Sequence, residues 1–307
     1  MAVRRTLTRR VFNGVSFAAF LGFRRAVSGL PWSGAYLLAD LLALAWWAVD
    51  ARHRRLALAN LAIAFPRWPE GKRRRIALKS YRNLSRTLVE TLRYRVLLDG
   101  RWQERIVFDR PGIFEKARER GKGVMAVSGH LGNWEWLSGH AIRYGRVHII
   151  ARAIHNPLLD REIRKRREEA GVHQIYPDRE SPRKILKALR AGEALCFLVD
   201  QSAKGDEGVE VPFFGKPAPT HTGPAVLALR TGASVFSIFT HRDARNRIHI
   251  VYGEPIEVVR TGNRQRDIET NTALFTRRVE EAVRNHPDQY FWVHDRWRIR
   301  KRKRRRR

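Results

Sequence analysis

The sequence is poor in sulfur, and this shortage excludes several kinds of site. It has one cysteine, Cys196, and two methionines among 307 residues. A single cysteine excludes a disulfide framework and a cysteine-based zinc site within one chain. Cys196 lies in the apolar run Ala-Leu-Cys-Phe-Leu-Val at 194–199. We therefore expect it to be a core residue and not a nucleophile.

Acidic side chains are also scarce relative to basic ones. Lys and Arg number 61 against 30 Asp and Glu, which gives a formal net charge of +31. Such a charge predicts anionic partners: nucleic acid, an anionic membrane surface, or an acidic protein or lipid. Composition alone does not choose among them, and a biased genome can account for part of the arginine.

Several familiar catalytic and nucleotide-binding motifs are absent. Ser128 is not in a Gly-x-Ser-x-Gly elbow, because Ala126 and His130 stand where the glycines would be. The next histidine, His140, is ten residues on, which excludes a His-Glu-x-x-His zinc site. No Gly-x-x-x-x-Gly-Lys-Ser/Thr loop occurs. The segment 121–126 matches a relaxed dinucleotide fingerprint, but it runs into a predicted strand and does not follow one.

Long hydrophobic runs are confined to the N-terminal part. A basic start and the apolar segment 15–23 resemble a signal peptide or anchor, although Arg24 and Arg25 interrupt it and no small-residue cleavage site is clear. The stretch 30–49 is long enough to span a bilayer, but Asp40 near its centre would cost about 2.5–3.5 kcal/mol there. A helix in the membrane interface, or one packed on the catalytic domain, remains an alternative.

Hydrophobic periodicity predicts an α/β fold with a mixed central sheet and flanking helices. Residues 1–100 are expected to be mostly helical, with helices at 52–65 and 70–98. Strands are predicted at 123–128, 147–151, 174–176, 194–199, 234–240 and 248–252, and they alternate with helices at 133–144, 156–170, 181–191, 222–231 and 267–285. We expect an N-terminal membrane-associating region, 1–100, an α/β domain, 101–297, and a disordered polybasic tail, 298–307.

The chemistry is predicted at the turn after the first of these strands, Val-Ser-Gly-His-Leu-Gly-Asn-Trp-Glu at 127–135. On one continuous helix His130 and Glu135 would point about 140° apart. They converge only if His130 lies in the loop and Glu135 in the first helical turn, with Asn133 as N-cap. A neutral histidine can then deprotonate a hydroxyl while a carboxylate fixes its tautomer. The structural alternative is a histidine packed over a turn and a glutamate that serves the helix dipole.

Further segments along the chain resemble one known family. These are Asn-Leu-Ala-Ile-Ala-Phe-Pro at 60–66, Arg152 with Asn-Pro-Leu at 156–158, Asp-Gln at 200–201 with Val-Pro-Phe-Phe-Gly at 211–215, and His-Pro-Asp-Gln-Tyr-Phe-Trp-Val-His-Asp-Arg-Trp at 286–297. With the His-x4-Glu motif, they resemble the lipid A biosynthesis (lauroyl/myristoyl) acyltransferases, within the wider glycerolipid acyltransferase superfamily. Tyr290 stands where that family frequently has Trp.

The resemblance implies roles for individual residues. His130 would be the general base that deprotonates a lipid hydroxyl, and Glu135 would orient it and balance its charge. The alkoxide would attack an acyl thioester without an acyl-enzyme intermediate, and neither a metal nor a cofactor is implied. The implied substrate-binding residues are Arg152, Asn156, Arg164, Arg167, Asp200, Phe213, Phe214, Thr220 and Arg296. The two phenylalanines would line an acyl pocket, and Arg152 would bind phosphate or stabilise the oxyanion.

The resemblance also implies partners and a location. The donor would be acyl-carrier protein or acyl-CoA, and the acceptor an anionic glycolipid at the cytoplasmic face of the inner membrane, in a late step of lipid A biosynthesis. A phosphatidylinositol mannoside or lysophospholipid acceptor remains open, as does hydrolysis by the same pair. The alternative from another class is a basic nucleic-acid-binding protein, but the sequence carries no known nucleic-acid motif.

Overall fold

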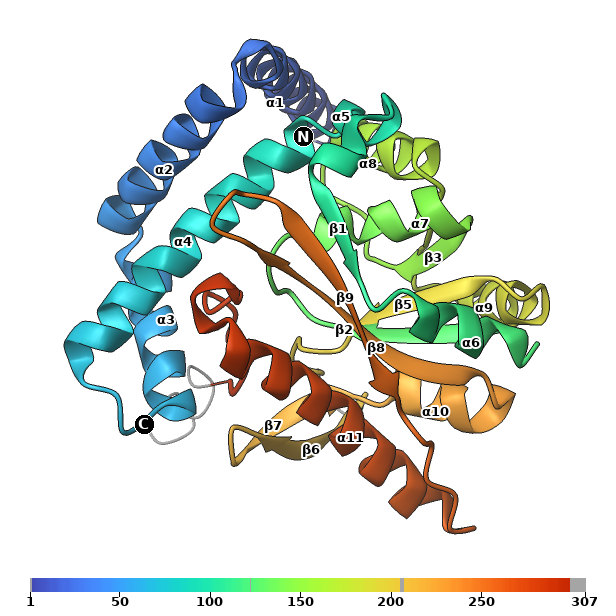
Figure 1. The fold of residues 1–307 in the computed structure, drawn as a ribbon. Coiled ribbons are helices and arrows are strands. Elements are labelled where there is room, and N and C mark those ends of the chain that lie inside the picture. Colours follow the sequence, from blue (N-terminus) through green and yellow to red (C-terminus); the bar gives the residue numbers. More distant parts are fainter. Residues whose placement is uncertain (1, 122, 205–206, 299–307) are drawn as a thin grey trace.

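The N-terminal part is helical, as predicted. The computed structural model describes residues 2–121, 123–204 and 207–298. The first elements are α1 (Ala2–Gly29), α2 (Trp32–Val49), α3 (Ala51–Ala64), α4 (Glu70–Leu92), α5 (Arg95–Leu98) and the 3₁₀ turn η1 (Arg101–Glu104). The helix expected at 70–98 is therefore broken into α4 and α5. In Figure 1, α1 to α4 lie along one side of the sheet.

A seven-stranded mixed sheet forms the centre of the molecule, which confirms the predicted fold class. Its strands are β1 (Ile106–Asp109), β2 (Val124–Ser128), β3 (Val147–Ile150), β4 (Val172–Ile175), β5 (Ala194–Leu198), β8 (Ser234–Arg242) and β9 (Ile248–Pro255). Their order is β1-β9-β8-β2-β5-β3-β4, and only the β8–β9 pair is antiparallel. The carboxyl ends of β2, β5 and β3 thus meet at one edge, where α/β sheets usually bind ligands.

Helices follow most strands. They are α6 (Gly112–Glu119), η2 (Trp134–Leu137), α7 (Ser138–Tyr144), α8 (Pro157–Glu169), α9 (Ser181–Arg190), α10 (Gly223–Thr231), α11 (Arg264–Asn285) and η3 (Pro287–Gln289). The sequence did not predict β1, α6 or the separate hairpin of β6 (Gly208–Phe213) and β7 (Lys216–His221). The helix predicted at 133–144 is a 3₁₀ turn followed by a short α-helix.

Alternating residues of the sheet enter two cores. Met125 and Val127 of β2 face a core that includes residues of α3, α4, α9, α10 and α11, whereas Val124 and Ala126 face a core with α6 and α7. This is the period of two that a strand covered on both faces requires. Cys196 lies in the second core, as predicted.

The N-terminal helices share the main core with the sheet. Leu61 of α3 and Tyr81 of α4 belong to the same buried cluster as Val127 of β2 and Phe275 of α11. The division at residue 100 stays a prediction, and the shared cluster indicates that the two parts pack as one body. The predicted tail, 298–307, lies outside the described residues except for Arg298.

Candidate active site

His130 lies in the tight loop that follows β2, where the sequence placed it. Gly132 has φ +61, and a Cβ on it would come 2.3 Å from the carbonyl oxygen of Thr240. Only glycine fits that backbone and that approach. Asn133 then caps η2, because its side chain accepts a hydrogen bond from Trp136 N at 3.2 Å. The predicted loop position of His130 and the N-cap role of Asn133 are confirmed.

The carboxylate that holds His130 is Asp200. His130 Nδ1 lies 2.7 Å from Asp200 Oδ1, and the backbone N–H of His130 donates to Asp200 Oδ2 at 2.8 Å. The register of β2 and β5 explains this pairing. Ser128 is level with Leu198 on the neighbouring parallel strand, so two residues further on His130 is level with Asp200.

The predicted pairing of His130 with Glu135 is therefore wrong. Glu135 lies in the 3₁₀ turn and is held by Arg167 of α8. Arg167 Nη2 donates to both carboxylate oxygens, at 2.8 and 3.1 Å, and Nε contributes a third contact at 3.3 Å. A planar guanidinium matches a carboxylate in this bidentate way. The five-residue spacing directs Glu135 toward α8, while the adjacent strand supplies the partner of His130.

Burial and charge both act on this pair. Burial lowers the pKa of His130, but the charge of Asp200, its hydrogen bond and the charge of Glu135 outweigh that effect and raise the pKa above its usual value. Burial raises the pKa of Asp200, yet the charge and hydrogen bonds of His130 lower it to about 2. Asp200 is therefore ionised, and it favours the tautomer with the proton on Nδ1. With Nδ1 protonated, Nε2 of His130 accepts from the side-chain amide of Gln201, whose Nε2 lies 3.3 Å away.

The C-terminal block, residues 286–297, packs on the same loop. Phe291 N donates to His130 O at 3.1 Å, and Leu131 forms an isolated β-bridge with Tyr290. The rings of Trp134 and Phe291 lie 5.1 and 5.6 Å from the imidazole. Burial and the nearby charge of Asp200 raise the pKa of Tyr290 well above its usual value, so its hydroxyl stays protonated. Aromatic side chains thus flank the imidazole of His130.

Other predicted substrate residues hold the hairpin β6–β7 in place. Arg296 is buried, and its guanidinium donates to Pro219 O and Thr220 Oγ1, both at 2.6 Å. It also lies 5.1 Å from the ring centre of Phe213. Phe213 and Phe214 are buried in the main core. These contacts show that both phenylalanines pack in the core.

The remaining predicted residues have mixed positions. Asn156 caps α8 and donates to Asn13 O and Ser16 Oγ, which ties α8 to α1. Arg164 is partly exposed and lies 3.9 Å from Glu168. Arg152 follows β3 at the same sheet edge as His130 and is exposed.

His221 marks a positive region near Arg152. Burial lowers the pKa of His221, and the positive charges of Arg152, Arg296 and Arg298 lower it further, although Glu207 opposes them. Among these cations Arg152 is exposed and Arg296 is buried, so Arg152 is accessible to an anionic substrate.

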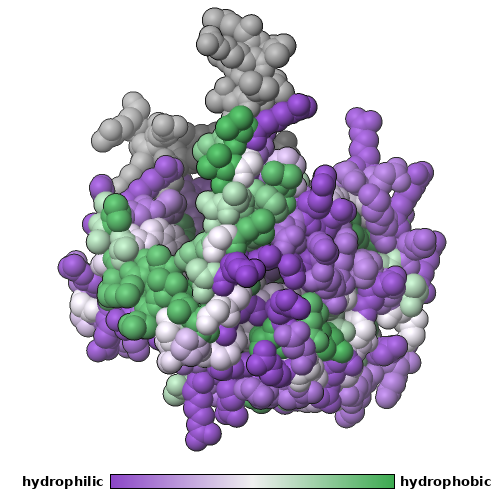
Figure 2. Space-filling model, turned by 90° about the horizontal axis from the view of Figure 1, so that it is seen from above, coloured by the Kyte–Doolittle hydropathy of each residue, from purple (hydrophilic) through white to green (hydrophobic). Residues whose placement is uncertain are grey.

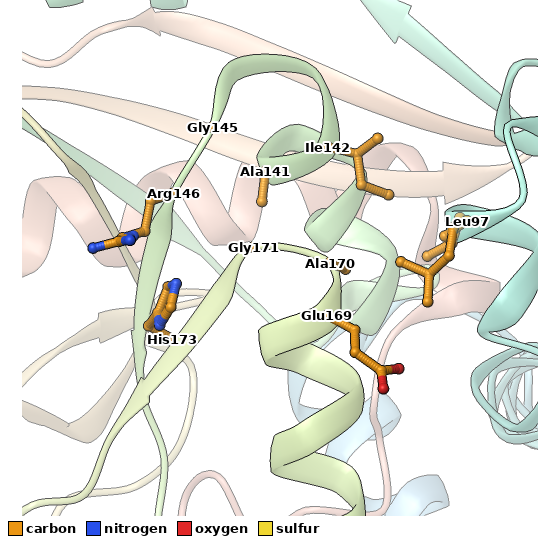
Figure 3. Close-up of a pocket in the computed structure, with 10 residues that line it drawn as sticks. Leu97, Ala141, Ile142, Gly145, Arg146, Glu169, Ala170, Gly171 and His173 are labelled. Atoms are coloured by element: carbon orange, nitrogen blue, oxygen red, sulfur yellow. The ribbon is translucent and has the colours of Figure 1, made fainter.

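A separate pocket lies away from His130 (Figure 3). Its volume is about 460 Å³, and its lining side chains come from α5, α7, α8 and β4. Arg146 and His173 flank one side, and Leu97 and Ile142 the other. No residue of the His130–Asp200 pair lines it. Within the described ranges, no group of three or more His, Cys, Asp or Glu could hold a metal ion.

The face formed by α1 and α2 is apolar. Leu37, Leu41 and Leu44 share one side of α2 and are exposed, while Ala35 and Ala39 pack inward. Exposed Val11, Phe12 and Val15 extend the apolar surface onto α1. Figure 2 shows hydrophobic side chains gathered on this face. In the described part of the chain, α2 is the one helix long and apolar enough to cross a membrane, by length and composition alone.

Comparison with known proteins identifies the family. The sequence matches the family of bacterial lipid A biosynthesis acyltransferases over residues 7–299. The lipid A biosynthesis palmitoleoyltransferase of Escherichia coli (strain K12) is 26% identical over 253 residues, 81% of this chain and 80% of that protein. The lauroyltransferase of the same strain is 26% identical over 254 residues, again 81% and 80%.

A second group of relatives shares part of the chain. The phosphatidylinositol mannoside acyltransferase of Mycolicibacterium smegmatis is 28% identical over 169 residues, 53% of this chain and 54% of that protein. The family match, in contrast, runs through nearly the whole sequence, including the His130 loop and the C-terminal block. This chain is an acyltransferase that belongs to the bacterial lipid A biosynthesis acyltransferase family.

Proposed function

We propose that the protein transfers a fatty acyl chain from a thioester donor to a hydroxyl of a membrane glycolipid, with His130 as general base. The observation that carries the proposal is the His130–Asp200 pair, with Nδ1 bound at 2.7 Å and Nε2 left available beside the Gln201 side-chain amide at 3.3 Å. An imidazole held in this way accepts a proton at Nε2, and the ionised Asp200 stabilises the imidazolium that forms.

The reaction follows from this arrangement. Nε2 of His130 removes the proton of the acceptor hydroxyl, and that oxygen attacks the thioester carbonyl. The tetrahedral oxyanion collapses, the C–S bond breaks, and the thiolate leaves with the proton from the imidazolium. The sulfur of the donor is a good leaving group, so no covalent enzyme intermediate is required. Arg152, exposed at the same sheet edge, is our candidate for binding a phosphate of the acceptor or the oxyanion.

Glu135 has a different proposed role from the one the motif implied. Its carboxylate is neutralised by Arg167, while its charge still contributes to the raised pKa of His130. We propose that Glu135 stabilises the imidazolium from a distance, while Arg167 fixes the position of the Glu135 carboxylate. Both residues therefore support the base without contacting Nε2.

The acceptor and donor are proposed from the relatives. Two of these act in lipid A biosynthesis and one on phosphatidylinositol mannoside, so a glycolipid acceptor is common to both groups. We propose a late step of lipid A biosynthesis, with acyl-carrier protein or acyl-CoA as donor. The net charge of +31 favours an acidic carrier protein and an anionic lipid alike.

We propose that the protein works on the cytoplasmic face of the inner membrane, with α1 and α2 lying in the interface. Asp40 of α2 is held by Arg86 of α4 through bonds of 2.9 and 2.8 Å, which fix the middle of α2 against the catalytic body. Its apolar side remains free for lipid. Leu41→Asp should weaken binding to phosphatidylglycerol vesicles, whereas the matched Leu98→Asp on α5 should not. Equal vesicle binding by both variants would contradict the membrane assignment.

The central test is the product formed by His130→Ala. Purified protein is supplied with an acyl thioester and a glycolipid acceptor, and acylated lipid and free fatty acid are measured by mass spectrometry. We expect His130→Ala to lose about 10²- to 10⁴-fold in transfer rate. His173→Ala, at the opposite edge of the sheet, is the matched control and should retain activity. Wild-type turnover in His130→Ala, or free fatty acid as the main wild-type product, would overturn the proposal.

A further inference from the structure

A buried polar stripe on α4 faces the catalytic loop. Asn83, Thr87 and Glu90 are four and three residues apart, so they lie on one side of the helix. All three are buried, and Glu90 is completely inaccessible. Apolar side chains would fill these positions in an ordinary packed helix. The stripe was not predicted from the sequence, although polar residues at helical spacing within a basic and apolar helix are a signal that could have revealed it.

Two residues of the stripe bind the carbonyl of Gly132, two residues after His130. The Nδ2 of Asn83 donates to Gly132 O at 2.8 Å and to Gln289 O at 3.1 Å. Thr87 Oγ1 donates to the same Gly132 carbonyl at 3.0 Å. Gln289 O in turn accepts from Gly132 N at 3.1 Å. The middle of the loop is therefore bound from α4 and from the C-terminal block together.

Glu90 binds the far end of the loop. Its Oε2 accepts from Asn133 Nδ2 at 2.7 Å, and its Oε1 accepts from Tyr36 of α2 at 2.8 Å. Arg242 of β8 pairs with the same carboxylate and balances its charge. Asn133 uses its other side-chain atom to cap η2, the turn that carries Glu135. Through Asn133, Glu90 is thus connected to the loop that carries His130 and to the turn that carries Glu135.

We propose that Glu90 is a positioning residue for acyl transfer, which holds the turn bearing His130 and Glu135 through Asn133 while Asn83 and Thr87 hold Gly132. This inference rests on the proposed role of His130 as base. Arg242 already balances the charge of Glu90, so Glu90 does not need Asn133 as a counter-charge. The Nδ2 of Asn133 is aimed at Glu90 all the same, and this links the ion pair to the loop. Figure 1 shows α4 lying between α2 and the sheet, where it can reach both.

The first test compares two threonines of one helix. Thr87→Val removes a hydroxyl that binds the loop, and Thr91→Val removes one that binds only the carbonyl of residue 87 in its own helix. Because Asn83 still binds Gly132, we expect Thr87→Val to lower kcat a few-fold, about three- to tenfold, with KM for the thioester nearly unchanged. Thr91→Val should keep the wild-type kcat. Equal kcat values in the two variants would contradict the claim that the polar stripe of α4 positions the catalytic loop.

The second test removes the anchor of Asn133. Glu90→Gln should lower kcat about ten- to a hundredfold, since small displacements of reacting groups are costly. Because Arg242 would then lack its counter-charge, the variant could fail to fold. The double variant Glu90→Met with Arg242→Met removes both charges from the same space and keeps the packing. It should show a cooperative thermal unfolding transition, as a folded protein does, and the same loss of kcat.

The outcomes separate this inference from the proposed function. Histidine labelled with ¹³C at Cε1 reports the titration of His130 by NMR without any substrate. In the double variant we expect the His130 resonance to titrate at lower pH, because the loop no longer holds the ring against Asp200. A folded double variant with wild-type kcat and wild-type titration would overturn the positioning role. If His130→Ala itself retained activity, the proposed function would fail whatever Glu90 does.

Discussion

Replacing Asp200 by asparagine separates the charge of the catalytic pair from its shape. Asn keeps a side chain of the same size at the end of β5, next to His130 Nδ1. It removes the negative charge that, after burial is overcome, raises the pKa of the imidazole. An amide can also present its NH₂ group to Nδ1, which favours the wrong tautomer for proton abstraction at Nε2. We expect a fall in kcat of about 10²- to 10⁴-fold.

The structure also gives a magnitude for stability. The pKa of Asp200 is 3.8 in an ordinary setting and about 2 in the fold, which corresponds to about 2 kcal/mol in favour of the ionised form. This contribution is present above pH 3.8 and is lost as pH falls through the lowered pKa. At neutral pH, Asp200→Asn should therefore lower the free energy of unfolding by about 2 kcal/mol.

The pH dependence gives the sharper assay. Because the pKa of His130 is raised, its stabilising contribution is present below pH 6.5 and is lost as pH rises through the raised pKa. Activity has the opposite sign, since the base must be neutral, and kcat/KM should rise through the same pKa. In Asp200→Asn this rise of kcat/KM, the acid limb of the pH profile, should move to lower pH, and the maximal kcat/KM should fall.

A matched control is available in the same fold. Asp109 Oδ2 lies 2.8 Å from His249 Nδ1, which is a second aspartate–histidine pair of similar geometry. Asp109→Asn should leave the rate and the pH limb unchanged. Wild-type kcat with an unmoved acid limb in Asp200→Asn would refute the assignment of Asp200 as the partner of the base.

Two more substitutions follow from contacts in the site. Arg167→Lys should lower kcat about tenfold, because one ammonium cannot replace the bidentate bonds to Glu135, whereas Arg166→Lys on the same helix should be neutral. Equal rates would contradict a role for that pair. Gly132→Ala should destabilise by more than about 2 kcal/mol and abolish activity, while Gly215→Ala, with φ +70 but open space, should cost only about 1 kcal/mol. Similar melting temperatures for the two alanine variants would show that the contact between residue 132 and the Thr240 carbonyl does not determine the loss of stability.

Much of the fold was predictable because its elements are strongly patterned. The strands at 123–128 and 194–199 are short apolar runs, and they are the central β2 and β5. The hairpin β6–β7 was missed because proline occurs in both strands, and Phe214 adopts φ +52 at the turn, where glycine or asparagine is usual. Short β1 was missed because only Ile106 of its four residues is buried, so periodicity gave little signal.

The site was predicted in part, and the error has a physical cause. The sequence located His130, its loop and its need for a carboxylate. It assigned Glu135 because that residue is near in sequence, whereas the true partner is 70 residues on. Strand register brings Asp200 level with His130, and register between distant strands is not visible in one sequence. Asp200 directly follows the strand predicted at 194–199, and the resemblance implied it as a substrate-binding residue, so it was predicted in the site but not as the partner of His130.

Asp40 shows how the surface and the site are joined. In the sequence it argued against a membrane span, because a charge in the bilayer is costly. In the structure it binds Arg86 of α4, so the polar side of α2 is used for packing and the side with Leu41 is left exposed. One turn further along α4, Glu90 binds the catalytic loop through Asn133. A single helix, about 10–12 Å across with its side chains, therefore separates the apolar helix from the loop that carries the base. The interfacial placement proposed for α2 would therefore bring the base within about one helix diameter of the lipid headgroups.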